Sequence, residues 1–171
     1  FRSGMGALKY FILKVDPKKR MLFNPAESID LNGNTGPFIQ YTHARIRSVI
    51  RKSEKSGNLH GGEGRETRDD VTRHPSHVPS YEMSKEEKEL LKQLYRYPAI
   101  LTEAAASHSP ALVANYTYEV AKSFNHFYHD HVIVDESDAA SSKFRIKLSE
   151  LTSAVIKEGM RLLGIEVPER M

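Results

Sequence analysis

The 171-residue sequence contains no cysteine, and no apolar run approaches the roughly 18 residues typical of a membrane-spanning helix. Without thiols, disulfides and thiolate metal sites are excluded, and a reducing compartment is favoured. The first residue is Phe1 rather than an initiator Met, and no apolar core of a secretory signal follows it, so this start resembles a cut or cloning boundary. We therefore expect a soluble protein without a membrane anchor.

The charge balance is only slightly basic. Lys and Arg total 25 against 22 Asp and Glu, which gives a net charge of +3. This excess permits contact with a polyanion without requiring it, because such numbers also describe a well-solvated surface. With 39% apolar and 27% charged residues, the chain has the composition of one ordinary globular domain.

The first region, residues 1–50, leads from a short apolar stretch into a predicted helix. Pro37 follows turn-forming residues and suits a first helical position, because its missing N–H would have no partner there. The expected helix is about four turns long. Its residues Ile39, Ile46 and Val49 are spaced to form one apolar face.

The second region, residues 51–80, is almost devoid of aliphatic residues. Only Leu59, Val71 and Val78 interrupt a series of charged residues, glycine and histidine. Such a segment cannot bury enough apolar surface to order itself. We therefore expect a flexible polar connection that a protease would cut first.

The third region, residues 81–171, is predicted to be helical. Ser84 and Glu87 have the spacing of a capping box, and Ser109-Pro110 suits an N-cap and first helical residue. Apolar residues then recur every three or four positions in two stripes, and Gly164 follows the second in the C′ position. The stripes are Val113, Tyr116, Val120, Phe124 and Phe127, then Phe144, Leu148, Leu151, Val155, Ile156, Leu162 and Leu163. The predicted fold class is an all-α helical bundle with a flexible polar insertion.

Three segments resemble arginyl-tRNA synthetases in the same order along the chain. They are the helix-opening stretch Gly33–Ser48, the stretch Ala114–Val134 with Phe124-Asn125-His126-Phe127-Tyr128 inside it, and the close Gly159–Met171. The resemblance covers most of the chain. It implies the carboxy-terminal part of a class I synthetase, whose helical anticodon-binding domain is named after the residues Asp-Ala-Leu-Arg.

The resemblance also implies an organisation and a partner. Residues 1–50 would join the catalytic region to the first bundle helix, and residues 81–171 would form the remainder of the bundle. The parent enzyme would attach arginine to tRNA(Arg) with ATP and Mg²⁺ in the cytoplasm. For this chain we expect tRNA(Arg) as the partner, no DNA, no membrane and a monomeric state.

The matching positions that the resemblance places at the anticodon loop are Phe38, Arg45, Tyr128 and Met171. Phe38 stands where a tyrosine is often found, so the ring is kept and a hydrogen bond from a hydroxyl is lost. The residue types suit the task, because rings stack on splayed bases and cations hold phosphate. Phe38 and Arg45, seven residues apart, fall on nearly the same helix face about 10 Å from each other.

Further candidates for RNA or interdomain contacts are Gln40, Tyr41, His43, Arg47 and Lys122. The first three match the family motif, but polar contacts that hold the first helix to its neighbours explain them equally well. Arg47 and Lys122, like Arg51 and Lys52, are candidates by charge alone.

No catalytic residue is predicted in this chain. His74-Pro75-Ser76-His77 has the histidine spacing of a class I ATP-binding sequence but lacks its glycine and a preceding strand. Met83-Ser84-Lys85 matches the centre of a Lys-Met-Ser-Lys-Ser loop but begins a helix, and Gly61–Gly64 lacks a flanking strand and helix. We therefore expect no cofactor in this chain and no adenylate formation.

A group of histidines raises a different possibility. They are His126, His129 and His131, with Asp130 among them and His108 nearby in sequence. Zinc would accept such donors, but a site needs three or four ligands in a supported setting, and Phe127 and Tyr128 already explain the segment as bundle packing. We predict no metal site. The rival functions are a helical protein-interaction module without an RNA role and a metal-dependent hydrolase built on these histidines.

Overall fold

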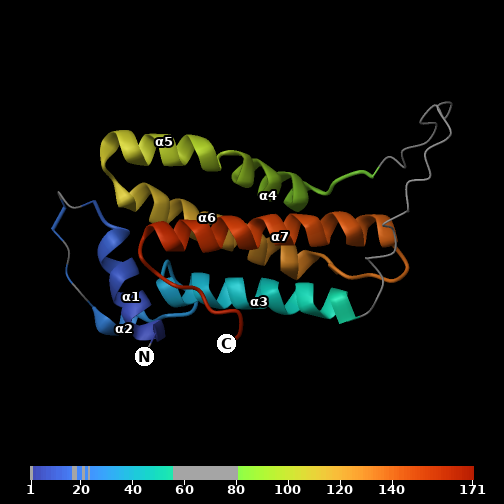
Figure 1. Cartoon of the computed structure of the whole chain (residues 1–171), viewed down its shortest axis with the longest axis horizontal. Helices are drawn as coiled ribbons and strands as arrows, with labels where there is room; N and C mark the ends of the chain where they lie inside the picture. The colour runs from blue at the N-terminus through green and yellow to red at the C-terminus, as the bar shows by residue number, and fades with distance from the viewer. Residues whose placement is uncertain (1, 17–18, 21, 23, 56–80) are drawn as a thin grey trace, which may run out of the picture.

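The computed structural model describes residues 2–16, 19–20, 22, 24–55 and 81–171, and these residues form helices without any strand. The all-α prediction is therefore confirmed for the described part of the chain. The helices, labelled in Figure 1, are α1 (Arg2–Leu13), α2 (Pro25–Ser28), α3 (Gly36–Lys55), α4 (Lys85–Tyr95), α5 (Tyr97–Ser107), α6 (Pro110–Asp130) and α7 (Ala139–Leu162).

Three long helices, α3, α6 and α7, make the centre of the bundle. Helix α7 packs on both α3 and α6, while α4 and α5 cover α6 along the edge opposite α3 (Figure 1). The ring of Phe38, near the start of α3, meets Tyr118 of α6 at a centroid distance of 5.3 Å. Arg45, two turns further along α3, meets Asn125 of α6, so α3 and α6 run parallel.

The stripe predicted on α6 is confirmed, because all five of its residues are buried. On α7, Leu148, Val155 and Ile156 are buried as predicted, but Leu151 and Leu162 are each 48% exposed. Thr152 occupies the core in place of Leu151, since the advance of about 100° per residue turns position 151 to the edge of the stripe.

The predicted helix boundaries at Ser84, Ser109 and Gly164 are confirmed. Ser84 Oγ accepts from the amide of Glu87 at 3.1 Å, and Glu87 Oε2 accepts from the amide of Ser84 at 2.8 Å, which completes the capping box. Ser109 is the N-cap of α6, although its side chain makes no capping hydrogen bond. Gly164 has a φ of 68°, and the Ile165 amide donates to Met160 O at 2.9 Å, as in a Schellman motif.

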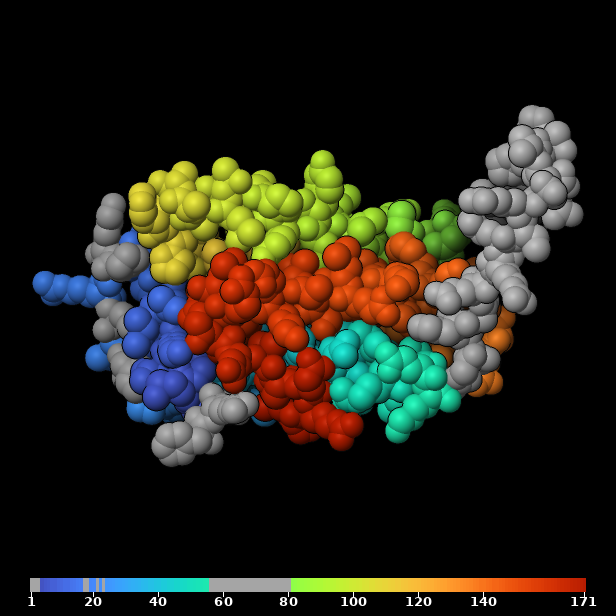
Figure 2. All heavy atoms as spheres, in the orientation of Figure 1, coloured from blue at the N-terminus to red at the C-terminus, as the bar shows by residue number. Residues whose placement is uncertain are grey.

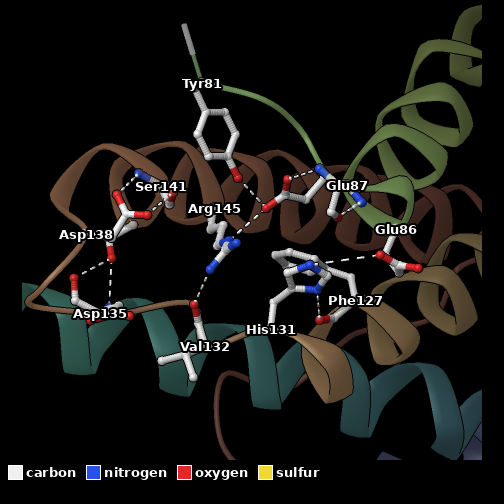
Figure 3. Close-up of polar contacts among 12 residues, drawn as sticks. Tyr81, Glu86, Glu87, Phe127, His131, Val132, Asp135, Asp138, Ser141 and Arg145 are labelled. Carbon is white, nitrogen blue, oxygen red and sulfur yellow. Dashed lines mark hydrogen bonds and ion pairs between the residues drawn. The ribbon is translucent and has the colours of Figure 1, made fainter. Parts of the chain in front are cut away.

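A buried carboxylate fixes the start of α4 against α7. Glu87 is completely buried and accepts hydrogen bonds from the Tyr81 hydroxyl at 2.5 Å and from Arg145 Nε at 2.7 Å (Figure 3). Burial alone would raise the pKa of Glu87, but these hydrogen bonds and the one from the Ser84 backbone together hold it below its usual value. Arg145 also donates to Val132 O at 2.8 Å, so the same cluster ties down the connection between α6 and α7.

Tyr10 attaches α1 to the bundle. Its fully buried hydroxyl lies 2.6 Å from Asn34 Oδ1 and 2.9 Å from Ala114 O, which joins α1 to the turn before α3 and to α6. Burial raises the pKa of this hydroxyl above its ordinary value, so Tyr10 serves as a neutral structural link.

Helix α3 continues through Lys55, so the first five residues of the predicted flexible connection, 51–55, are helical instead. Residues 56–80, which include Gly61–Gly64 and His74–His77, lie outside the described residues. None of the described helices is both long enough and apolar enough to cross a membrane.

Candidate nucleic-acid interface

A groove opens where α3, the end of α6 and the last residues of the chain meet. We call it the tyrosine groove. It has a volume of about 410 Å³ and is lined by Tyr41, Ala44, Arg45, Ser48, Val49, Arg51, Lys52, Tyr128, Arg170 and Met171.

Arg45 lies at the centre of the tyrosine groove. Its guanidinium carbon is 4.8 Å from the ring centroid of Tyr41 and 5.2 Å from that of Tyr128. Its Nη1 donates to Asn125 Oδ1 at 2.6 Å, and the Asn125 amide nitrogen in turn donates to Thr42 Oγ1 at 2.8 Å. Contacts of this cation–π type contribute about 0.5–2 kcal/mol depending on exposure. Arg45 therefore fixes the two rings relative to each other.

Both tyrosine rings remain accessible. Tyr41 is 42% exposed and Tyr128 is 39% exposed. The ring of Tyr128 is stacked on Phe124 of the same helix, with 6.1 Å between centroids and 26° between planes. The groove thus presents aromatic rings that pack against neighbouring side chains on one side and are open to solvent on the other.

The charged side chains that line the tyrosine groove are all positive. Its ionisable side chains other than tyrosine are Arg45, Arg51, Lys52 and Arg170. Within the described ranges, none of these four makes an ion pair with an Asp or Glu side chain. Cations left unpaired beside exposed rings form the combination that binds single-stranded nucleic acid.

A second hollow of about 480 Å³ continues from the tyrosine groove past Tyr128. It shares Val49, Lys52 and Tyr128 with the groove and extends along residues 129–134. Tyr128 consequently lies between two adjoining depressions.

A family model described as the DALR anticodon binding domain matches residues 39–171. This chain belongs to that family. The match includes every residue that lines the tyrosine groove.

Full-length relatives of this DALR domain extend well beyond it. The chain is 47% identical over 169 residues to the arginine-tRNA ligase of Porphyromonas gingivalis, and 49% identical over 169 residues to that of Parabacteroides distasonis. In each case the match covers 98% of this chain and 26% of the relative, so the chain spans about a quarter of their length.

Solved structures of the same kind share the fold of this DALR domain. The arginyl-tRNA synthetase of Thermus thermophilus superposes with a TM-score of 0.78 at 25% identity, over 99% of this chain and 27% of that one. The arginyl-tRNA synthetase of Plasmodium falciparum, at 23% identity and a TM-score of 0.72, supports the fold alone over 97% of this chain and 26% of that one.

Three of the four residues that the sequence indicates for the anticodon loop come together in this DALR domain. Arg45, Tyr128 and Met171 all line the tyrosine groove. Phe38 does not, because its partly buried ring packs on Tyr118, ten residues before Tyr128 and thus about 15 Å away along α6.

The further candidates lie in three different places. Gln40 and His43 are buried and bond to backbone carbonyls near the end of the chain, and Arg47 pairs with Glu169 at 2.6 Å. Tyr41 instead lines the tyrosine groove. Lys122 is exposed on α6, and its helical spacing places it between Tyr118 and Asn125 on the same face.

Sequence reasoning missed the contribution of Arg170 to the groove. This residue adjoins Met171, so its proximity in sequence was the available signal. It also missed Asn125, which fixes Arg45 and stands within the quoted segment Phe124–Tyr128.

The possible ATP and metal motifs find no support among the described residues. Ser84 of Met83-Ser84-Lys85 is committed to the capping box of α4. His129 is exposed and pairs with Asp130, whereas His131 stacks on Phe127 and faces Glu86 at 3.9 Å (Figure 3). No group of three or more potential ligands is placed to hold a metal ion in the part of the chain that the structure describes.

Proposed function

We propose that this chain is the carboxy-terminal, anticodon-binding part of an arginine-tRNA ligase and that its tyrosine groove takes bases from the anticodon loop of tRNA(Arg). The observation that carries the proposal is the guanidinium of Arg45 held between two accessible tyrosine rings. The high identity to arginine-tRNA ligases over 98% of the chain supports the choice of RNA.

The groove would offer three kinds of contact to the RNA. The rings of Tyr128 and Tyr41 offer stacking surfaces, worth about 1–3 kcal/mol per base in comparable sites. Arg51, Lys52 and Arg170 offer charge to the phosphates of the same strand. Met171, 61% exposed, adds an adaptable thioether that packs against a base.

Phe38 and Lys122 extend the proposed surface toward the start of the α3–α6 seam. Phe38 lies against Tyr118 there, and Lys122 stands on α6 between that pair and the groove. An RNA strand that follows the seam would meet these residues outside the tyrosine groove.

The parent enzyme would attach arginine to tRNA(Arg) with ATP and Mg²⁺, in the cytoplasm and as a monomer. The chemistry would belong to the remainder of the parent enzyme, and among the described residues no group of three or more potential ligands is placed to hold a metal ion. The chain is therefore expected to show no arginine-dependent pyrophosphate exchange, even with tRNA present. Exchange above a buffer blank would contradict the assignment of this chain as a binding part alone.

The test of RNA binding compares tRNA(Arg) with a non-cognate tRNA at two salt concentrations. With three or four cations at phosphates, the logarithm of the binding constant should fall with the logarithm of salt concentration with a slope of about −2 to −3. Lys52→Ala should make that slope shallower by nearly one unit. Lys92→Ala, a matched loss of one exposed charge on α4, should leave it unchanged.

A helical protein-interaction module and a histidine-based hydrolase are the rival functions. No contact in the described residues favours either, and the family match points to neither. Equal affinity for both tRNAs, or a slope that Lys52→Ala and Lys92→Ala change alike, would count against the proposed groove.

A further inference from the structure

One face of α3 holds the segment that follows α7. Four residues on this face, each three or four positions after the previous one, contact residues 166–169, and Figures 1 and 2 show the last residues of the chain crossing α3. The contacts are Gln40 Nε2 to Glu166 O at 2.7 Å, His43 Nδ1 to Pro168 O at 2.9 Å, Arg47 Nε to Glu169 Oε2 at 2.6 Å, and Arg51 Nη1 to Glu169 O at 3.0 Å.

The residues after this held segment complete the tyrosine groove. Arg170 and Met171 line it together with Tyr41, Arg45 and other residues of the adjoining face of α3. Helix α3 therefore lines the groove with one face, and with the adjoining face it holds the segment that places Arg170 and Met171 in the groove.

His43 is the last buried anchor before the groove. Its side chain is fully buried, whereas Arg47 and Glu169 keep 34% and 50% of their side-chain surface exposed. An exposed ion pair contributes little to stability, whereas removal of a buried donor leaves its acceptor without a hydrogen bond, which costs considerably more. The position of the segment at Pro168 therefore depends mainly on His43.

The bond to Pro168 requires a particular form of the imidazole. A carbonyl only accepts hydrogen bonds, so Nδ1 carries the hydrogen and Nε2 is unprotonated in the neutral ring. Nε2 is buried and has no hydrogen-bond partner among the described residues. Burial lowers the pKa of His43, opposed by the bond to Pro168 and by Glu169 of the terminal segment, and assisted by Lys157 of α7 and Arg47 of α3.

We propose that His43 is a positioning residue for RNA binding, whose neutral ring holds the backbone at Pro168 and thereby places Arg170 and Met171 in the tyrosine groove. The inference rests on the proposed function for its effect on RNA. Protonation at Nε2 places a charge where no described acceptor faces it, so acidification should release the terminal segment.

The test is a thermodynamic cycle on binding of the tRNA(Arg) anticodon stem-loop. Deletion of Arg170 and Met171 from the parent chain should weaken binding by about tenfold, the effect expected of one lost contact with a base. His43→Leu, which removes the donor, should cause a similar loss, and the deletion should then add less than about twofold. His43→Asn, whose amide can replace the Nδ1 donor, should recover most of the affinity.

A control variant separates this role from general destabilisation. Tyr116→Phe removes a hydrogen bond of 2.8 Å to Gln93 O on the α4 side of the bundle. Any loss of RNA affinity that this variant causes should be independent of the deletion, so the two fold-changes in affinity should multiply. The proposal would be overturned if folded His43→Leu bound the RNA as tightly as the parent. It would also be overturned if the fold-losses of affinity from His43→Leu and from the deletion multiplied fully.

Hydrogen exchange of residues 165–171 without RNA distinguishes the two proposals. Protection of this segment should fall in His43→Leu at pH 7 and, in the parent, as the pH falls below about 6.5. In His43→Asn, protection should vary less with pH, because the titrating ring is gone. No RNA binding by the parent would count against the proposed function alone, while unchanged protection in His43→Leu would overturn the role of His43.

Discussion

Tyr128 shows how packing holds a ring of the proposed binding surface in place. Its ring lies on Phe124 on one side and near the guanidinium of Arg45, yet 39% of the residue is exposed. A ring already fixed by its neighbours loses little freedom when a base stacks on it, so more of the contact energy appears as affinity.

Replacement of Tyr128 tests whether its ring stacks on a base. Tyr128→Ala should weaken binding of the tRNA(Arg) anticodon stem-loop by about 1–3 kcal/mol, and Tyr128→Phe should keep most of the affinity because stacking needs only the ring. The dependence on salt should stay the same, since no cation is removed. Binding isotherms at two salt concentrations provide both quantities.

Tyr95 offers the matched control. It is 87% exposed at the end of α4, away from the tyrosine groove, so Tyr95→Ala should leave RNA affinity unchanged. Equal losses in Tyr95→Ala and Tyr128→Ala would mean that the stacking site is placed wrongly. A melting curve for each variant checks that the bundle remains folded.

At the scale of elements, the first turn of α4 depends on a charged group without solvent contact. Glu87 closes the capping box and accepts from Tyr81 and Arg145, so one carboxylate joins the start of α4 to α7 (Figure 3). The contacts offset the cost of burial, and they hold the pKa of Glu87 below its usual value.

Glu87→Gln keeps the shape and removes the charge. We expect the free energy of unfolding at pH 7 to fall by about 1.5–3 kcal/mol, the range for hydrogen bonds to a charged group. Because the folded pKa is depressed, the stabilisation is complete above the unfolded value of about 4.3 and is lost as pH falls through the folded value. The parent should therefore lose more stability than Glu87→Gln between neutral pH and pH 3.

Denaturant unfolding at several pH values measures this difference. Lys147→Ala is the control, since it breaks the exposed pair with Glu150 and should cost less than about 1 kcal/mol. Parallel stability curves for the parent and Glu87→Gln would show that the carboxylate contributes nothing through its charge.

The crossing of α6 and α7 depends on a missing side chain. A Cβ at Gly159 would overlap the hydroxyl of Thr117, which donates to Val113 O at 2.8 Å within α6. Both residues are buried, so neither an added methyl group nor the Thr117 hydroxyl can move into solvent to relieve the overlap.

Gly159→Ala should consequently lower the free energy of unfolding by about 1–3 kcal/mol through overpacking. In a Thr117→Ala background the same change should be neutral or stabilising by up to about 1 kcal/mol, because the overlap is gone and alanine favours the helix. Thermal or denaturant unfolding of the four proteins completes the cycle. Equal effects of Gly159→Ala in both backgrounds would contradict the proposed close approach.

For the whole molecule, sequence patterns predicted the helices but not how the last residues contribute to the site. The capping box at Ser84 and the positive φ at Gly164 depend on local chemistry, so the sequence was sufficient to locate them. Which residues share a groove depends on how helices far apart in sequence pack. The sequence therefore left Tyr41 undecided between RNA contact and packing although it lines the groove, and Phe38 was grouped with residues that lie elsewhere.

Periodicity also assigned too much of α7 to the core. Leu151 fits a spacing of three from Leu148, yet Thr152 is the buried residue, because only the contacts with α3 and α6 decide the centre of a helix face. The placement of Arg170 and Met171 follows from hydrogen bonds between α3 and the segment after α7. No local sequence pattern predicts these bonds, because the bonded residues lie far apart in sequence.

The central claim is that a base of the anticodon loop stacks on Tyr128 in the tyrosine groove. The most direct measurement compares the parent and Tyr128→Ala in binding the tRNA(Arg) anticodon stem-loop with each loop base removed in turn. At one position, loss of the base should cost the parent about 1–3 kcal/mol and cost Tyr128→Ala less than about 0.5 kcal/mol. Equal costs for the two proteins at every position would contradict the account.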